Sequence, residues 1–168
     1  MNNIIESTLI TLQKSKSLLT FLSNDKLCDK SVSPYFSSVG GHVRHIYDFY
    51  DCILSTNDKG SYDLTNRKRI AIIETCCDSA LDYFNELTNK IKSLNRKGNE
   101  IVMVIDDLGT GKIEMEYTFS ALLAQANSHA IHHYAIISYI LDRLNVTIED
   151  PDFGYNPTTP KPAVSSLN

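Results

Sequence analysis

The stretch from residue 120 to 144 repeats its apolar side chains every three or four residues, which is the period of an α-helix. The apolar members of this stripe are Leu122, Ala126, Ile137, Ile140 and Leu144. Two positions on the stripe hold histidine instead, His129 and His133. A one-sided helix is stabilised mainly by packing its apolar face against other elements. The stretch therefore predicts a core helix with two imidazoles pointing inward.

Three further segments carry apolar stripes of the same period and predict the helices that cover this core. They run from 4 to 23, from about 39 to 54 and from about 67 to 95. Four helices in a chain of 168 residues predict a mainly α-helical fold, a four-helix bundle. We expect this domain to span residues 1–149. Residues 150–168 hold four of the five prolines and predict an extended tail that packs on or near the bundle.

Two strand-like runs separate the third and fourth predicted helices. Residues 101–105 are rich in β-branched side chains, and residues 113–119 alternate apolar with polar side chains. The segment between them, 106–111, contains two aspartates and two glycines, which favour a turn. The pattern predicts a β-hairpin inserted before the last helix.

The charge and the hydropathy of the chain narrow the classes of partner. The formal net charge is -4, whereas nucleic-acid binding needs a basic face, so we predict no nucleic-acid partner. No apolar run approaches the ~20 residues that span a bilayer. The first residues lack the basic region and the long apolar core of a signal peptide. We therefore predict a cytoplasmic protein with no membrane partner.

Two smaller clusters receive structural interpretations. Residues 67–69 are Arg-Lys-Arg, and Glu74 and Asp78 follow within three turns. We interpret this cluster as the solvated start of the third helix rather than as a phosphate site. The cysteines show no CxxC spacing, which favours small buried side chains over disulfides or zinc ligands in a reducing compartment. They are Cys28, Cys52, Cys76 and Cys77.

All five histidines fall in two short windows, each on a predicted helix. His129 and His133 are four residues apart, so their rings lie on one helix face, one turn from each other. In the earlier window, His45 lies in mid-helix and is a better inward candidate than His42. One nitrogen from the earlier helix and two from the last would give a metal three neutral ligands and leave a position open for water or substrate. Hydrogen-bonded core histidines are the alternative, but the cost of burying unpaired imidazoles favours the metal.

Four further side chains are candidates for the mouth of a pocket or for support of the metal ligands. They are His42, Asp48, Gln125 and His132. Asp48 follows His45 by three residues, where it could orient a ligand, although an exposed helix carboxylate is the favoured interpretation. Cys52 is placed to reach the same groove, although a packed core thiol is the favoured interpretation. No Ser-His-Asp or activated-cysteine pattern stands out, so the sequence identifies no catalytic residue.

The segments around the histidines resemble the DinB-like superfamily of bacterial four-helix-bundle proteins. They are residues 38–46 (SVGGHVRHI) and residues 128–137 (SHAIHHYAII). The stretch 62–74 and the tail segment 151–159 are also similar to some members. The resemblance therefore covers most of the chain and keeps the order of the segments. Each motif alone is loose, and the ordered set is what makes the resemblance specific.

The resemblance implies a divalent ion, most often nickel or zinc, held by His45, His129 and His133. It also implies activation of a low-molecular-weight thiol or of water in transferase, isomerase or hydrolase chemistry on a small molecule, and a homodimer. The chain departs from some similar sequences at Phe49, where they carry a further histidine. It departs again at residues 121–122, where they carry an Arg-Glu pair. Both departures leave the three ligands intact and change the surrounding pocket.

Three functions remain open on the sequence. The first is a metal-dependent enzyme, a thiol transferase or hydrolase, since an open position on the ion lowers the pKa of a bound water or thiol. The second is a non-catalytic metal-binding or stress-associated protein, because a fold shared with enzymes does not imply turnover. The third and weakest is a metal-free dimeric scaffold whose histidines only pack.

Overall fold

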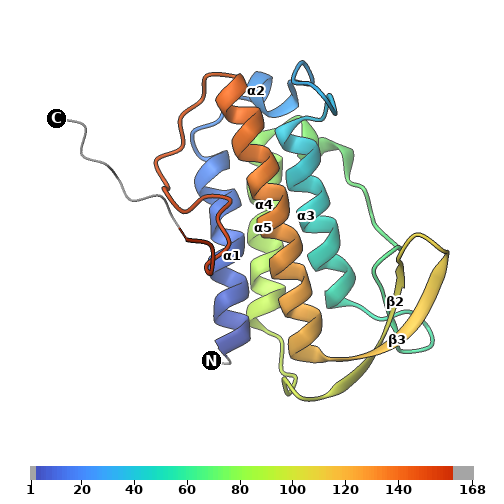
Figure 1. Ribbon diagram of the computed structural model, residues 1–168. Coiled ribbons are helices and arrows are strands. Elements are labelled where there is room, and N and C mark those ends of the chain that lie inside the picture. Colours follow the sequence, from blue (N-terminus) through green and yellow to red (C-terminus); the bar gives the residue numbers. More distant parts are fainter. Residues whose placement is uncertain (1–2, 161–168) are drawn as a thin grey trace.

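The computed structural model of the chain describes residues 3–160. The protein is mainly helical, as the sequence predicts, and also contains a small three-stranded sheet. Its four long helices lie side by side (Figure 1); they are α1 (Asn3–Leu19), α3 (Val39–Leu54), α4 (Cys77–Lys92) and α5 (Phe119–Arg143). The shorter elements are α2 (Asn24–Cys28), the 3-10 helix η1 (Ala71–Glu74) and the strands β1 (Tyr62–Asp63), β2 (Ile101–Asp107) and β3 (Lys112–Thr118).

Helices α3 and α5 pack against each other and carry all five histidines. Each begins at a side-chain cap: the Ser38 hydroxyl accepts the Gly41 N–H at 3.0 Å, and the Thr118 hydroxyl accepts the Ala121 N–H at 3.1 Å. A buried hydrogen bond joins the two helices, donated by the Tyr50 hydroxyl to Asn127 Oδ1 at 2.8 Å. The apolar stripe predicted for α5 is buried along its whole length, from Leu122 to Leu144. The two histidine windows are therefore held on facing helices by a shared core.

The third helix begins later than predicted. Residues 67–70 are not helical, and α4 starts only at Cys77, after η1. Tertiary contacts account for the difference, because the Asp48 carboxylate accepts the backbone N–H of Arg69 at 3.0 Å while Arg69 has a positive φ of 54°. The Asn24 side chain accepts the N–H of Cys77 at 2.8 Å and so satisfies one free donor in the first turn of α4. The predicted helix from 67 to 95 is therefore wrong at its first turns.

The first helix also ends earlier than predicted, at Leu19 rather than at residue 23. The following residues form the short helix α2, whose first turn is capped by the Ser23 hydroxyl. The segment at which the predicted first helix ends thus starts another helix, because Ser23 is an N-cap residue. Within residues 3–160, no helix is long and apolar enough to cross a membrane.

The predicted hairpin is confirmed. Strands β2 and β3 pair antiparallel, with Ile101 opposite Thr118, and the connecting turn places Gly109 and Gly111 at φ of +100° and +101°. These values lie in the region that favours glycine. The parallel strand β1 adds to the other edge of β2, with Tyr62 opposite Val104. Two residues are too short a segment for periodicity to reveal, so the sequence did not predict β1.

The described part of the predicted tail, residues 150–160, lies along α1 and α5 (Figure 1). Phe153 is buried, and its ring packs on Tyr134 with centroids 5.1 Å apart. Lys14 of α1 donates to the Asp150 carboxylate at 2.8 Å. The tail thus covers the helix that carries His129 and His133, while residues 161–168 lie outside the described part of the chain. The division into residues 1–149 and 150–168 stays a prediction.

The cysteines only partly match their interpretation as buried side chains. All four are free; Cys52 and Cys77 are buried, Cys76 is partly buried and Cys28 is exposed. The prediction is therefore wrong for Cys28, which ends the short helix α2 at the surface, a helix that the sequence did not reveal.

Replacing Gly40 with alanine is expected to lower the free energy of unfolding by about 1–3 kcal/mol, the usual cost of an overpacked site. A Cβ at this position would lie 2.2 Å from the carbonyl oxygen of Glu74, so α3 and η1 would have to move apart. Gly41→Ala is the matched control, because its Cβ would meet only the Ser38 hydroxyl, at 3.3 Å. Urea unfolding of both variants is the measurement, and equal losses would contradict the close approach.

Candidate metal centre

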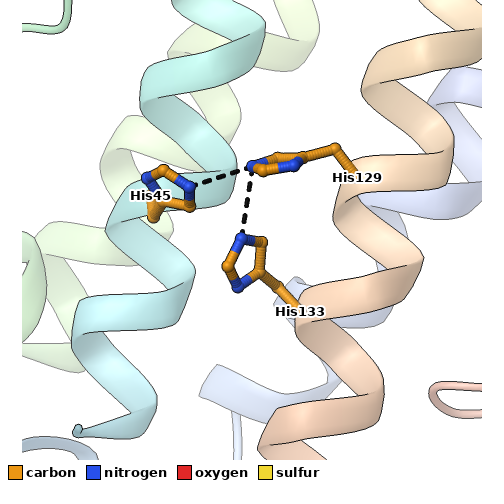
Figure 2. Close-up of side chains that lie close together, drawn as sticks. All are labelled: His45, His129 and His133. Carbon is orange, nitrogen blue, oxygen red and sulfur yellow. Dashed lines mark hydrogen bonds between the residues drawn. The ribbon is translucent and has the colours of Figure 1, made fainter. Parts of the chain in front are cut away.

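Three histidines from two helices converge between α3 and α5. His45 comes from α3, and His129 and His133 come from successive turns of α5 (Figure 2). The Nε2 atom of His129 lies 3.0 Å from Nε2 of His45 and 3.2 Å from Nε2 of His133. One ligand atom from each of the three lies within 4.8 Å of the other two. The structure therefore brings together the three residues that the sequence selected.

Two of the separations between these nitrogens match a metal site. Zinc–nitrogen bonds of 2.0–2.1 Å in tetrahedral geometry place neighbouring ligand nitrogens about 3.3 Å apart. The two Nε2 separations around His129, 3.0 and 3.2 Å, are close to that value. Since one ion would replace both direct nitrogen–nitrogen contacts, the three rings can hold an ion with small side-chain movements. The three-histidine cluster thus fits a divalent ion.

The electrostatics also fit, because a histidine ligand must be neutral. Burial, followed by the nearby cation Arg67, lowers the pKa of His45 and of His129 to about 4. Burial, followed by the neighbouring imidazoles, lowers the pKa of His133 to about 2. All three rings are therefore neutral near pH 7, with lone pairs that an ion would accept.

Phe49 closes one side of the cluster. Its ring stacks on His129, with centroids 4.6 Å apart and an interplanar angle of 29°. Phe49 is buried and stands where some sequences of the resembling family carry a further histidine. An apolar ring supplies no ligand atom, so this position cannot donate to an ion and instead fixes the orientation of His129.

His42 is placed to orient one of the three ligands through a hydrogen bond. Its Nδ1 lies 2.9 Å from Nδ1 of His133, and its Nε2 lies 2.8 Å from the hydroxyl oxygen of Ser37. If His133 binds an ion through Nε2, its Nδ1 carries the proton and donates to His42. Such an outer hydrogen bond orients a ligand and sets its tautomer. The sequence held a signal for this role, because His42 and His45 are three residues apart and therefore neighbours on one helix face.

His42→Ala is expected to weaken zinc binding by about 10- to 100-fold, the usual cost of losing the outer partner of a ligand. His132→Ala is the matched control, since it removes an exposed histidine whose ring is also 5.1 Å from that of His133. Competition with a coloured chelator measures both affinities. Equal zinc affinity in the two variants would show that His42 does not support His133.

Arg67 is the site neighbour that sequence reasoning missed. Its Nη1 donates to Nδ1 of His45 at 3.2 Å, and its Nε donates to the carbonyl of Leu64 at 3.2 Å. The adjacent Lys68 pairs with the buried Asp51 at 2.6 Å. The interpretation of residues 67–69 as a solvated helix start is therefore wrong, because the segment is not helical and faces α3.

Asp48 does not contact the three histidines directly. It is buried, and its carboxylate accepts from Arg44 at 2.5 Å and from the backbone N–H of Arg69. Arg44 also donates to Glu74 at 2.5 Å. The favoured interpretation of an exposed carboxylate is therefore wrong. Asp48 acts on the site through Arg44, which lines the adjoining cavity, and through its hydrogen bond to the segment that carries Arg67.

The remaining candidates are His132, Gln125 and Cys52. His132 is exposed and lines a surface groove beside the tail. The side-chain oxygen of Gln125 is buried without a hydrogen-bond partner among the described residues. The thiol of Cys52 donates to the Asn66 carbonyl at 3.5 Å, and burial raises its pKa to about 11. Cys52 is thus a packed core thiol, as favoured from the sequence.

A cavity of about 360 Å³ opens directly onto the cluster. Its walls are formed by Lys30, Tyr35, Phe36, Ser37, Ser38, Gly41, His42, Arg44, His45, Glu74 and His133. The volume is sufficient for a small molecule. Lys30 and the exposed pair Tyr35 and Phe36 could not be predicted from the sequence, because a single loop with no periodicity carries them.

No family model, curated protein or solved structure matches the chain. The function is therefore inferred from the geometry of the site.

Proposed function

We propose that this chain is a divalent-metal-binding protein whose ion is held by His45, His129 and His133. The observation that carries the proposal is the convergence of their nitrogens, with Nε2 of His129 at 3.0 and 3.2 Å from the other two. Zinc or nickel is the proposed ion, because both suit imidazole ligands. Three protein ligands with a fourth position left open are typical of catalytic rather than structural zinc sites.

We further infer that the chain is a DinB-like four-helix bundle. The support is the packing of the four long helices and the placement of the ligands on α3 and α5, in the order that the resemblance implies. On the same basis we propose that the protein is a homodimer in the cytoplasm.

The proposed activity is that of a thiol transferase or hydrolase acting on a small molecule, with a low-molecular-weight thiol as the candidate cofactor. When bound, an ion of this kind lowers the pKa of a water or thiol at its open position. The chain itself orients the ligands: His42 forms a hydrogen bond with His133, and the ring of Phe49 stacks on His129. The cavity beside them admits a small molecule. His42 and Ser37 lie in the wall of that cavity and would contact what enters it.

A specific observation favours the second candidate, a non-catalytic metal-binding or stress-associated protein. Glu74, which lines the cavity, and Asp48 are both held by Arg44. Neither is therefore available as a general base without breaking an ion pair. The histidine cluster alone supports metal binding equally well in both candidates.

Metal analysis of the purified protein tests the metal site. We expect about one equivalent of zinc or nickel per chain, and a rise in the melting temperature when either ion is added to metal-free protein, because an ion that binds only the folded state stabilises it. Absence of metal together with an unchanged melting temperature would leave only the metal-free scaffold. A screen with thiols, electrophiles and esters then separates the first two candidates, since the enzyme requires turnover that is lost in His129→Ala.

A further inference from the structure

Arg67 is a half-buried cation with no acidic partner in the described structure. Among residues 3–160, no carboxylate forms an ion pair with it. Its hydrogen bonds go to the Leu64 carbonyl and to Nδ1 of His45. The positive charge of the guanidinium also lowers the pKa of His129. A partly desolvated cation without a counter-charge beside three converging imidazoles points to a ligand that supplies the charge.

While Arg67 donates a hydrogen bond to Nδ1 of His45, no metal ion can bind to Nε2 of the same ring. A guanidinium only donates, so Nδ1 of His45 must accept, and the proton of the neutral ring is on Nε2. An ion at Nε2 requires that proton to move to Nδ1. A protonated Nδ1 cannot accept from Arg67, so binding an ion at Nε2 breaks this hydrogen bond and frees the Arg67 fork.

The charges around the cluster favour an anion beside the Arg67 guanidinium once its hydrogen bond to His45 is broken. Three neutral imidazoles cancel none of the charge of a divalent ion, and Arg67 adds a further positive charge. The nearby carboxylates are already in ion pairs, Asp48 and Glu74 with Arg44 and Asp51 with Lys68. Two carboxylates, Asp48 and Glu74, share the single cation Arg44, so this group keeps one net negative charge. Within residues 3–160, however, no carboxylate pairs with Arg67, so we expect its counter-charge at the loaded site to come from a ligand.

We propose that the metal centre takes a ligand with an anionic oxygen group, a carboxylate or a phosphate-type group, and that Arg67 pairs with this group once the ion is bound. This inference rests on the proposed metal site and goes beyond it, because it names the class of ligand. The planar fork of arginine matches both kinds of oxyanion in a bidentate manner. Ion and oxyanion then each raise the affinity for the other, because coupling between two ligands is reciprocal.

Cobalt(II) binding to the full chain tests the coupling. Cobalt affinity is measured from its visible absorption, without anion and then with acetate or with methylphosphonate, at an ionic strength held constant with perchlorate. We expect about a tenfold gain in cobalt affinity from the oxyanion. Comparing acetate with methylphosphonate shows whether the site prefers a carboxylate or a phosphate-type group. Acetamide has the same shape as acetate without its charge and is expected to have no effect.

Arg67→Met is expected to bind cobalt more tightly than the unchanged chain when no anion is present, and to lose the gain from the oxyanion. Arg67→Lys keeps the charge without the fork and is expected to retain only part of the gain. Arg69→Met is the matched control, since it removes an exposed cation from the same segment. An unchanged anion effect in both Arg67 variants, or an equal effect of acetamide, would overturn the inference. Absence of cobalt binding to the unchanged chain is a different result, because it contradicts the metal site itself.

Discussion

Replacing His129 with alanine is expected to lower the affinity for zinc by at least about 100-fold, because loss of a direct ligand costs more than the 10- to 100-fold typical of an outer partner. Nε2 of His129 is the atom that lies close to both other ligand nitrogens, at 3.0 and 3.2 Å. Without it, His45 and His133 would leave an ion with two protein ligands, fewer than the three of known catalytic zinc sites. We therefore expect this change to have the largest effect on metal binding of any single substitution in the chain.

The control for this variant lies on the same helix. His132→Ala removes an imidazole from α5 at an exposed position and should leave zinc affinity unchanged. His129→Ala also leaves a gap beside Phe49, so thermal unfolding of the metal-free variants shows whether the fold is retained. His129→Gln fills more of that gap without an imidazole and should lose zinc as well. Zinc affinity in either His129 variant that equals that of His132→Ala would contradict the assignment of the ligands.

The parts of the structure that could be predicted from the sequence depend on local patterns. Helices α3 and α5 follow from apolar side chains at helical spacing, and the hairpin follows from alternation around a glycine-containing turn. The selection of His129 and His133 follows from the same helical geometry, which places residues four apart on one face. Local spacing alone does not show that these two residues approach His45, because that approach requires α3 and α5 to pack against each other.

The parts that could not be predicted depend on contacts between distant segments. The segment 67–76 has the composition of a helix start, yet Asp48 and Gly40, both on α3, hold it in another conformation. The role of Arg67 follows from that conformation, so no local pattern could have indicated it. The cavity has the same origin, since the loop that carries Lys30 meets α3 only in the folded chain.

The free energy of unfolding of the metal-free protein is expected to fall as the pH is lowered from about 6.5 to about 4. The pKa values of His45, His129 and His133 are lowered by folding, to about 4, 4 and 2, from an ordinary value of 6.5. Below pH 6.5 the unfolded chain therefore binds protons that the folded chain does not, and proton binding to the unfolded state destabilises the fold. Above pH 6.5 the rings are neutral in both states and contribute no pH dependence.

The expected loss at pH 5 is about 2 kcal/mol for each histidine, and up to roughly 6 kcal/mol for the three together, which is comparable to the whole stability of a small domain. Urea unfolding at pH 7.5, 6 and 5 measures it. Carboxylates also titrate toward the lower end of this range, so the difference between the unchanged chain and His129→Phe isolates one ring. That variant is expected to lose about 2 kcal/mol less between pH 7.5 and 5, because it has no imidazole to protonate when it unfolds. Parallel pH profiles for the two proteins would show that His129 is not held neutral by the fold, which would remove the electrostatic support for the metal site.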